Sequence, residues 1–394
     1  MKAGRTILVL FLVAAILGTA LVLVMPRDID LHLAQTEPSD VPEEETVVSL
    51  ADCGIIEDEE FGAVYIDTSI EDFNALGFEY GDSVDVVFSN GYELRDLPYY
   101  NGYYSRTDEP LLVGYPGSKH VKAAITNGDG LWEVAGLKDS DTVTVTLVEK
   151  GKYQEIQNAR DVHYVDDRDA FENDAVFANF RGVEAGDIKA DRLFRSASPC
   201  DNKHNRATYV DALMGEAGVA LILDLADSEE MLAEYPEAEG FDCPNFLKLY
   251  EAKKVVAVGL KMNFGSEEFR DKLGEALITM SEQPGPYLVH CTEGKDRTGF
   301  VCMLLEALCG ASYDEIVEDY MITYDNYYGI TRTSDPDRYR VIVAEVLDPM
   351  LQAMLGDDGA DLATADLKSA AEAYLKDAGM TDDQITALRN RLTA

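Results

Sequence analysis

The sequence predicts an α/β fold with a parallel-rich central sheet and helices on both of its faces. A small all-β accessory domain and an N-terminal apolar helix are expected to precede it. Three observations predict this fold class. In the C-terminal half, nearly continuous apolar runs alternate with helical patterns, which is typical of a buried parallel sheet. Strand-like runs with glycine-containing turns dominate residues 47–160, and residues 6–25 carry no charge.

Residues 1–26 are predicted to be a membrane anchor or a signal peptide. Lys2 and Arg5 precede the uncharged run 6–25, and a helix of that length spans roughly 30 Å, the thickness of a bilayer core. A cleavage site at Gly18-Thr19-Ala20 is the alternative, although the apolar run continues beyond it. Because positive residues stay in the cytoplasm, we expect an extracytoplasmic protein, anchored to the cell membrane by residues 6–25 or secreted after cleavage.

The acidic composition limits the possible partners. Residues 27–46 are acidic and interrupted by proline, which predicts a disordered linker. The whole chain has 33 Lys and Arg against 74 Asp and Glu, giving a net charge of −41. This charge argues against nucleic acid as a partner, and it repels anionic substrates at long range. An anionic substrate must therefore be captured by a local positive site.

Residues 47–160 are predicted to form a small barrel or sandwich. Turn-forming stretches, 89–91 and 126–130, separate four strand-like runs: 63–66, 84–88, 121–125 and 142–147. Four tyrosines are expected in a glycine-containing loop, as a binding surface or as turn packing: Tyr99, Tyr100, Tyr103 and Tyr104. We expect this domain to bind or position a ligand that the sequence does not identify.

Residues 165–394 are predicted to be the catalytic domain. Residues 219–225 form a buried strand by their apolar character, and residues 267–281 form a helix with a periodic apolar face. Cys302 and Cys309 lie seven residues apart on a predicted helix, where burial is expected. Cys200 and Cys243 could form a disulfide in an exported protein. The histidines show no metal-ligand spacing, and no cofactor is expected.

The chemistry is concentrated in residues 290–299, His-Cys-Thr-Glu-Gly-Lys-Asp-Arg-Thr-Gly. Apolar runs on both sides predict a strand, a tight turn and a helix, so the backbone N–H groups of the turn form an anion site. These groups and Arg297 favour the thiolate of Cys291. Arg297 can also bind two phosphate oxygens in parallel. The pattern predicts phosphoryl transfer through a cysteinyl-phosphate, followed by hydrolysis.

The other residues of the loop receive supporting roles. Thr298 is expected to donate its hydroxyl to the sulfur, and His290 is expected to orient the loop by hydrogen bonding rather than to exchange protons. Lys295 could reach a second phosphate of the substrate or remain solvated. The residues between the cysteine and the aspartate are predicted to bind the substrate: Thr292, Glu293, Gly294 and Lys295.

Residues 290–299 resemble the signature loop of the protein tyrosine phosphatase superfamily. The full form of the loop is most similar to a bacterial branch whose members act on phosphotyrosine and often on phosphoinositides. This resemblance implies a phosphatase-like fold over residues 165–394. Further segments that resemble the branch are 179–181, 193–197, 315–320, 370–375, 382–385 and 388–392.

The resemblance also implies an aspartate that protonates the leaving oxygen. Many members supply it from a Trp-Pro-Asp loop, but Trp132, the single tryptophan, is followed by glutamate. Asp296, inside the loop, is therefore the candidate. The alternative is that Asp296 pairs with a nearby lysine and only shapes the loop. Asp224 is the rival acid or a substrate-binding group.

One departure from the branch concerns the substrate. Relatives commonly have Asp-Leu-Arg where this chain has Asp224-Leu225-Ala226, so a basic residue near the site is missing and a phosphoinositide preference is in doubt. Arg195, Lys203 and Arg206 could compensate for it or be surface charge.

Three functions follow from these patterns. The first is a phosphatase for phosphotyrosine proteins that works through Cys291. The second keeps this mechanism but acts on phosphoinositides or inositol phosphates. The third is a non-catalytic phosphate-binding surface module, which the intact Cys291, Asp296 and Arg297 argue against, because binding alone requires no nucleophile.

Overall fold

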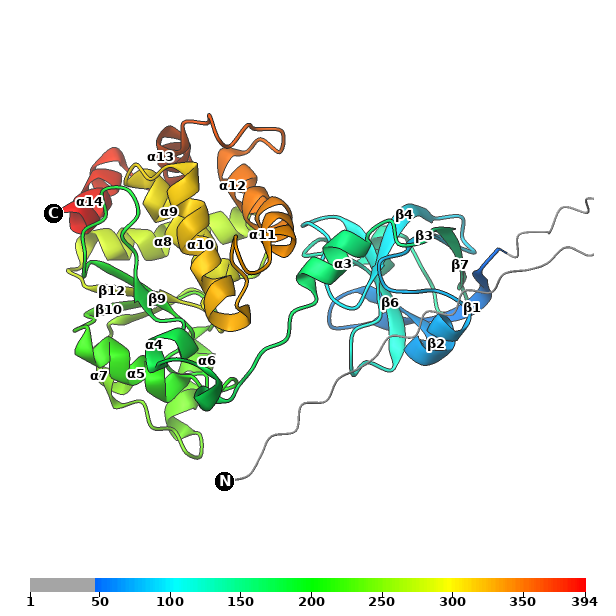
Figure 1. Ribbon diagram of the computed structural model, residues 1–394, viewed down its shortest axis with the longest axis horizontal. Coiled ribbons are helices and arrows are strands. Elements are labelled where there is room, and N and C mark those ends of the chain that lie inside the picture. Colours follow the sequence, from blue (N-terminus) through cyan, green and yellow to red (C-terminus); the bar gives the residue numbers. More distant parts are fainter. Residues whose placement is uncertain (1–46) are drawn as a thin grey trace, which may run out of the picture. The chain divides into compact units, whose positions relative to one another are not determined.

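The structure is a computed structural model that describes residues 47–394 (Figure 1). The predicted anchor, 6–25, and the predicted linker, 27–46, lie outside the described residues. Within residues 47–394 no helix has the length and apolar character needed to cross a membrane.

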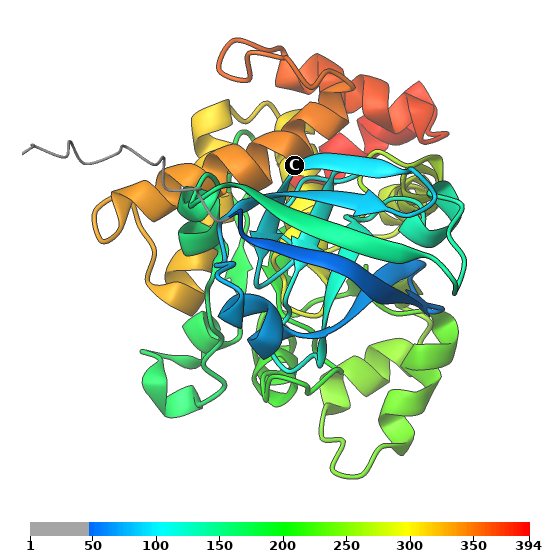
Figure 2. The ribbon, with the colours of Figure 1, turned by 90° about the vertical axis from the view of Figure 1, so that its right-hand side faces the viewer.

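Seven strands of the N-terminal part close into a barrel, with the order β1-β2-β6-β5-β4-β3-β7 (Figure 2). Neighbouring strands are antiparallel except for the parallel pair β4 and β5. The strands are β1 (Ser49–Asp58), β2 (Ala63–Ser69), β3 (Ser83–Phe88), β4 (Glu93–Tyr100), β5 (Pro110–Val113), β6 (His120–Ile125) and β7 (Thr142–Glu149). In β3, Val84, Val86 and Phe88 alternate into the barrel core, as the period of two requires.

The barrel agrees with the predicted β-rich architecture and refines it. All four predicted strands are present, but α1 (Ile70–Ala75) and α2 (Leu131–Val134) mean that the region is not all-β. The prediction of a loop for all four tyrosines was wrong, because Tyr99 and Tyr100 are buried in β4. Charged residues and Pro98 in that strand break the alternating pattern by which strands are recognised. The division into domains at 47–160 and 165–394 stays a prediction.

The C-terminal part contains a five-stranded sheet with the order β11-β10-β12-β9-β8. Its strands are β8 (Arg181–Gly182), β9 (Leu193–Ser196), β10 (Leu221–Asp224), β11 (Val255–Ala257) and β12 (Tyr287–His290). Only β8 is antiparallel to its neighbour. The sheet is therefore parallel-rich, and the predicted strand at 219–225 is confirmed as β10.

Helices cover both faces of this sheet, as predicted (Figure 1). Leu221 and Leu223 of β10 face the core formed with α8 (Glu267–Glu282) and α9 (Asp296–Leu308), whereas Ile222 faces the core formed with α5 (Ala207–Glu216) and α7 (Pro244–Glu251). The other helical segments are α3 (Gln154–Arg160), η1 (Arg168–Ala170), α4 (Asp174–Phe177), α6 (Glu229–Glu234), η2 (Tyr235–Glu237), α10 (Tyr313–Tyr328), α11 (Pro336–Ile342), η3 (Val343–Leu347), α12 (Asp348–Leu355), α13 (Leu367–Asp377) and α14 (Asp382–Thr393).

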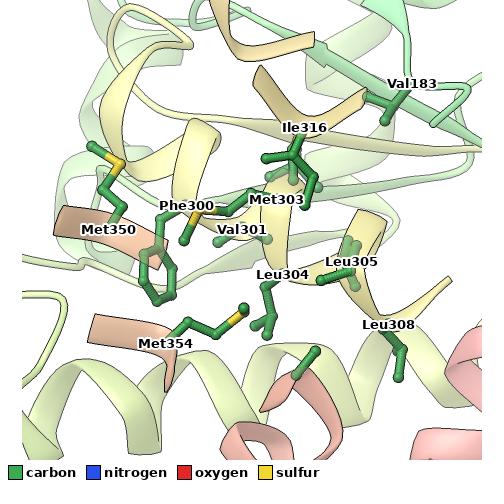
Figure 3. Packing of buried hydrophobic residues seen from close by; sticks show 14 of the residues in the cluster. Val183, Phe300, Val301, Met303, Leu304, Leu305, Leu308, Ile316, Met350 and Met354 are labelled. Atoms are coloured by element: carbon green, nitrogen blue, oxygen red, sulfur yellow. The ribbon is translucent and has the colours of Figure 1, made fainter. Parts of the chain in front are cut away.

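Helix α9 lies inside the larger core, and its residues 298–308 are all buried. In Figure 3, Phe300 and Leu304 of α9 lie next to Met350 and Met354 of α12. Because α9 is packed on all sides, its apolar residues do not follow a single stripe. This burial fixes the first turn of α9, which carries Asp296 and Arg297.

Two further predictions are settled by the structure. The closing segments 382–385 and 388–392 are one helix, α14, which begins with a capping box at Thr381. All six cysteines are free, so the Cys200–Cys243 disulfide that the sequence left open is not formed, while Cys302 and Cys309 are buried as expected.

Candidate active site

The candidate site lies at the carboxyl end of β12, the middle strand of the sheet. Strand β12 ends at His290, Cys291 follows directly, and α9 begins at Asp296. The predicted order of strand, turn and helix is therefore confirmed. The turn lies at the edge of a parallel sheet where ligands bind in α/β folds, beside the N-terminus of a buried helix.

The backbone of the turn is held from behind by the neighbouring strand. Gly294 has a φ of +68°, and a Cβ at this position would collide with the backbone of Ser196. Its carbonyl oxygen accepts hydrogen bonds from Arg195 Nη2 (3.1 Å) and Asn179 Nδ2 (3.2 Å). Thr292 O accepts from the Ser198 N–H at 3.2 Å. Gly294 thus shapes the loop, and its predicted contact with the substrate stays a prediction.

Arg195 and Arg206 are structural and do not face a substrate. Arg195 is 1% exposed and pairs with Asp319 at 2.5 Å. Arg206 is also buried and pairs with Asp166 at 2.8 Å. Both predicted roles, compensating substrate ligand and surface charge, were wrong for these two arginines, while Lys203 is exposed.

The guanidinium of Arg297 is oriented by two hydrogen bonds. Nη1 donates to Leu260 O at 3.1 Å, and Nη2 donates to Thr292 Oγ1 at 3.3 Å. Nε is buried and has no hydrogen-bond partner among residues 47–394. A buried donor without a partner is costly, and a phosphate oxygen is the kind of acceptor that would satisfy it. Thr292 orients the arginine, a role that the sequence did not predict.

The candidate nucleophile, Cys291, is buried. Cys291 is 3% exposed, at the start of the turn. Thr298 Oγ1 is buried and has no partner in the described part of the chain, so the hydrogen bond expected from Thr298 to the sulfur is not formed here. That role stays a prediction.

His290 lies behind the loop in an uncharged form. Burial lowers the pKa of His290 to about 4, so the ring is neutral at pH 7. Its Nδ1 lies 3.4 Å from Cys291 O, and its Nε2 lies 3.6 Å from Asp224 Oδ2. This geometry agrees with the expected orienting role and not with proton exchange.

Asp224 lies on the same rear side as His290. It is fully buried, and burial raises its pKa to about 6. Its Oδ1 accepts from the N–H groups of Ala226 (2.9 Å) and Asp227 (3.1 Å). These contacts turn Oδ1 toward its own loop, and the two roles considered for Asp224, general acid and substrate ligand, stay predictions.

Asp296 is the carboxylate that remains accessible. Its side chain is 27% exposed and lines a cavity of about 900 Å³, which Cys291 does not line. Tyr320 OH donates to Oδ1 at 3.4 Å, and Lys295 Nζ lies 3.8 Å from Oδ2. An accessible carboxylate one residue from Arg297 is suitably placed for proton transfer.

Lys295 and Glu293 are engaged with each other and with Tyr164, which sequence reasoning missed. Lys295 Nζ donates to Tyr164 OH at 3.0 Å and lies 3.2 Å from Glu293 Oε2, while Tyr164 OH donates to Glu293. Burial alone would lower the pKa of Lys295, but the Asp296 and Glu293 carboxylates raise it well above its usual value. The two loop charges are therefore committed to a partly buried network, and their predicted substrate contacts stay predictions.

Tyr164 reaches this network from a distant part of the sequence. Its ring lies 5.7 Å from Tyr327, 5.5 Å from Tyr328 and 5.0 Å from His204, measured between ring centroids. No motif marks it, because the contact joins residues more than a hundred positions apart.

One group of residues in the described part of the chain has metal-ligand types close together: Cys200, Asp224 and Asp227. Burial, followed by the charge of Asp224, raises the pKa of Asp227 to about 7. Tyr235 OH donates to Asp227 at 3.2 Å, and Cys200 Sγ lies 4.0 Å from Asp224 Oδ2. Protonation and these contacts account for the buried carboxylates, and we assign no metal to them.

Known proteins show related sequences. The family model described as "Tyrosine phosphatase family" matches residues 152–394. A "Tyrosine-protein phosphatase" of Nostoc commune is 30% identical over 232 residues, which are 52% of this chain and 75% of that protein. The "Triple specificity protein phosphatase PtpB" of Mycobacterium tuberculosis is 29% identical over 129 residues, 29% of this chain and 47% of that protein.

Two solved structures show weaker similarity. The core catalytic domain of the PP-IP phosphatase SIW14 from S. cerevisiae is 22% identical, with 41% of this chain and 83% of that chain covered and a TM-score of 0.26. An uncharacterized conserved protein from Thermotoga maritima is 20% identical, with 24% and 35% covered and a TM-score of 0.21. These scores are too low to carry an argument. The family match, together with the loop at Cys291, places the chain in the tyrosine phosphatase family, as a phosphatase hydrolase.

Proposed function

We propose that the chain hydrolyses phosphotyrosine-type phosphomonoesters through a cysteinyl-phosphate on Cys291. In the first step the thiolate forms an S–P bond as the P–O ester bond breaks, and Asp296 gives its proton to the leaving oxygen. In the second step water forms a P–O bond as the S–P bond breaks, and Asp296 takes a proton from that water. Phosphate and the free thiolate remain.

The observation that carries this proposal is the arrangement of Arg297. Leu260 O and Thr292 Oγ1 hold two of its nitrogens, while the buried Nε has no partner within residues 47–394. The guanidinium is thus oriented before the substrate arrives, next to the turn whose N–H groups follow Cys291. Preorganised donors of this kind stabilise the charge that develops on a transferring phosphoryl group.

The proposal is tested by separating binding from turnover. Cys291→Ser is expected to abolish hydrolysis of a phosphotyrosine peptide, because the serine hydroxyl is a far weaker nucleophile. The same variant is expected to bind the peptide within a few-fold of wild type in calorimetry, because Arg297 and the turn are unchanged. Hydrolysis by Cys291→Ser at the wild-type rate would contradict the covalent mechanism.

A phosphoinositide or inositol phosphate is the second candidate substrate. It requires the same cysteinyl-phosphate mechanism, and membership in the tyrosine phosphatase family does not distinguish it from a phosphotyrosine substrate. Against it, Arg195 and Arg206 are buried in structural ion pairs and do not supply the missing basic residue. Phosphate release from phosphotyrosine peptides and from inositol phosphates, compared at equal concentration, distinguishes the two. A non-catalytic binding module has no support from the family.

We also propose that the protein acts outside the cytoplasm, anchored by residues 6–25 or secreted after their removal. Fractionation of cells that express the full chain, followed by protease treatment of intact cells, tests this. A protein found in the cytosolic fraction would contradict it.

A further inference from the structure

The cavity beside Asp296 has walls from both parts of the described chain. It measures about 900 Å³, and residues 105–109 and Asn127 from the barrel loops line it together with Met262 and Phe264 of the catalytic part. Because Asp296 is on its wall, a group in this cavity would lie next to the proposed proton donor. The volume is in the upper part of the range for ligand sites, roughly 300–1,000 Å³.

Two arginines on the wall have no acidic partner. Arg160, at the end of α3, and Arg270, in α8, are both half-buried. The arginine ion pairs within residues 47–394 include neither of them. Arg270 Nε is also buried without a hydrogen-bond partner among the described residues. By contrast, Arg106 on the same wall is paired with Glu345 at 3.1 Å.

An unpaired, half-buried guanidinium destabilises the fold unless an anion binds to it. Two arginines without an acidic partner are unexpected in a chain with 74 acidic and 33 basic residues, because acidic partners are abundant. Arg160 is also preorganised, since its guanidinium lies 5.2 Å from the centroid of the Tyr104 ring. The two arginines therefore have the character of an anion site.

The acids on the same wall are arranged differently. Asp108, Glu109 and Asp358 are exposed, so water and salt screen them. Glu345 is occupied by Arg106. Asp296, the fifth acid on the wall, is partly buried but lies 3.8 Å from Lys295 Nζ. Among the described residues of this wall, the partly buried charges that lack an oppositely charged partner are those of the two arginines. The charge of Arg160 also reaches Tyr320: burial raises the pKa of Tyr320, and the Arg160 charge offsets part of that increase. Tyr320 is the residue that donates to Asp296.

The shape of the cavity favours an extended ligand. A second cavity of about 300 Å³ shares Asp108, Asn127, Asn263 and Ser266 with the large one, so the two are contiguous. Apolar side chains, Met262 among them, line the space between the charges. A single phenyl phosphate ester would fill only part of this volume, whereas several residues of a peptide would fit.

We propose that this cavity is the subsite for an anionic side chain next to the phosphotyrosine. The substrate would then be a phosphotyrosine peptide with a carboxylate or a second phosphate beside the scissile phosphate, held by Arg160 and Arg270. This inference rests on the proposed function, and it gives the barrel a role in choosing the substrate.

The test compares kcat/KM for matched phosphotyrosine peptides whose flanking residues are neutral, glutamate, or a second phosphotyrosine. For wild type, the ratio of an anionic peptide to the neutral one is expected to be about tenfold or more, the effect of one charge-assisted hydrogen bond. Arg160→Gln and Arg270→Gln are each expected to reduce this ratio at least threefold. Arg338→Gln, the control, removes an arginine that contacts Asn158 O at 2.8 Å without lining the cavity, and it should leave the ratio unchanged.

The ratio is measured within each protein sample, so partial unfolding of a variant cancels. The two anionic peptides distinguish a carboxylate from a phosphate as the preferred flank. A wild-type ratio near one, or an unchanged ratio in both variants, overturns the subsite while leaving the phosphatase intact. Faster hydrolysis of an inositol polyphosphate that also requires the two arginines would overturn the peptide assignment. Failure to hydrolyse any peptide, with no phosphate on Cys291, would refute the proposed function and this inference with it.

Discussion

Arg297→Lys tests the geometry of the site most sharply among conservative changes. In the structure the arginine donates from Nη1 to Leu260 O and from Nη2 to Thr292 Oγ1, while its Nε has no partner within residues 47–394 and is the group that we propose for the substrate. A lysine keeps the charge but has one nitrogen for all three positions. It must therefore give up the phosphate contact or the contacts that orient it.

The expected loss of activity follows from the number of nitrogens that each side chain offers. At least one charged hydrogen bond disappears from the transition state, which is worth roughly 1.5–3 kcal/mol. Such a loss lowers kcat/KM about 10- to 100-fold. The assay is hydrolysis of nitrophenyl phosphate, with thermal unfolding to verify that the variant folds. Arg338→Lys is the matched control, because Arg338 lies outside the site. A folded Arg297→Lys enzyme within threefold of wild type would refute the role that we assign to the guanidinium.

Three further predictions concern the surrounding groups. Asp296→Asn is expected to slow the hydrolysis of alkyl phosphates about 10²- to 10⁴-fold and that of nitrophenyl phosphate far less, because a good leaving group needs no proton. If the two measured rates fall equally, Asp296 only shapes the loop. Tyr164→Phe is expected to lower the free energy of unfolding by about 1–3 kcal/mol in urea titrations, because the partly buried charges of Glu293 and Lys295 lose a partner. An unchanged midpoint would contradict this. Burial and a neighbouring carboxylate raise the pKa of Asp227 to about 7. Its side chain is therefore protonated at pH 5, whereas at pH 8 it is ionised and this charge destabilises the fold. Asp227→Asn should therefore stabilise the fold at pH 8 more than at pH 5, and the reverse order in unfolding curves would show that the carboxylate is favourably charged.

The parts predictable from the sequence were those determined locally. The turn after β12 could be placed because its strand, its glycine and its helix are consecutive, and the helix at 267–281 because its apolar positions repeat at the helical period. The chemistry that we propose for Cys291 and Arg297 was inferred from the same consecutive residues.

The parts that could not be predicted depend on contacts between distant segments. Arg195 supports Gly294 across 99 positions, and Tyr164 joins Lys295 across 131. Neither residue differs in type or spacing from a surface residue, so the sequence left Arg195 as a substrate ligand or surface charge. Strand β4 was missed because Pro98 and the charged residues of this strand break the apolar alternation that marks a strand. The barrel that contains β4 is closed by pairing between strands distant in the sequence, which has no local signal.

The most direct test of the central claim is to find the phosphate on the sulfur. Cys291 is 3% exposed, so the measurement also asks whether the buried thiol is reached at all. The enzyme is mixed with a ³²P-labelled phosphotyrosine peptide, quenched in acid during turnover, digested and mapped by mass spectrometry. We predict label on the peptide that contains Cys291 and none in the Cys291→Ser variant. Rapid hydrolysis with no label on Cys291 at any quench time would contradict the account.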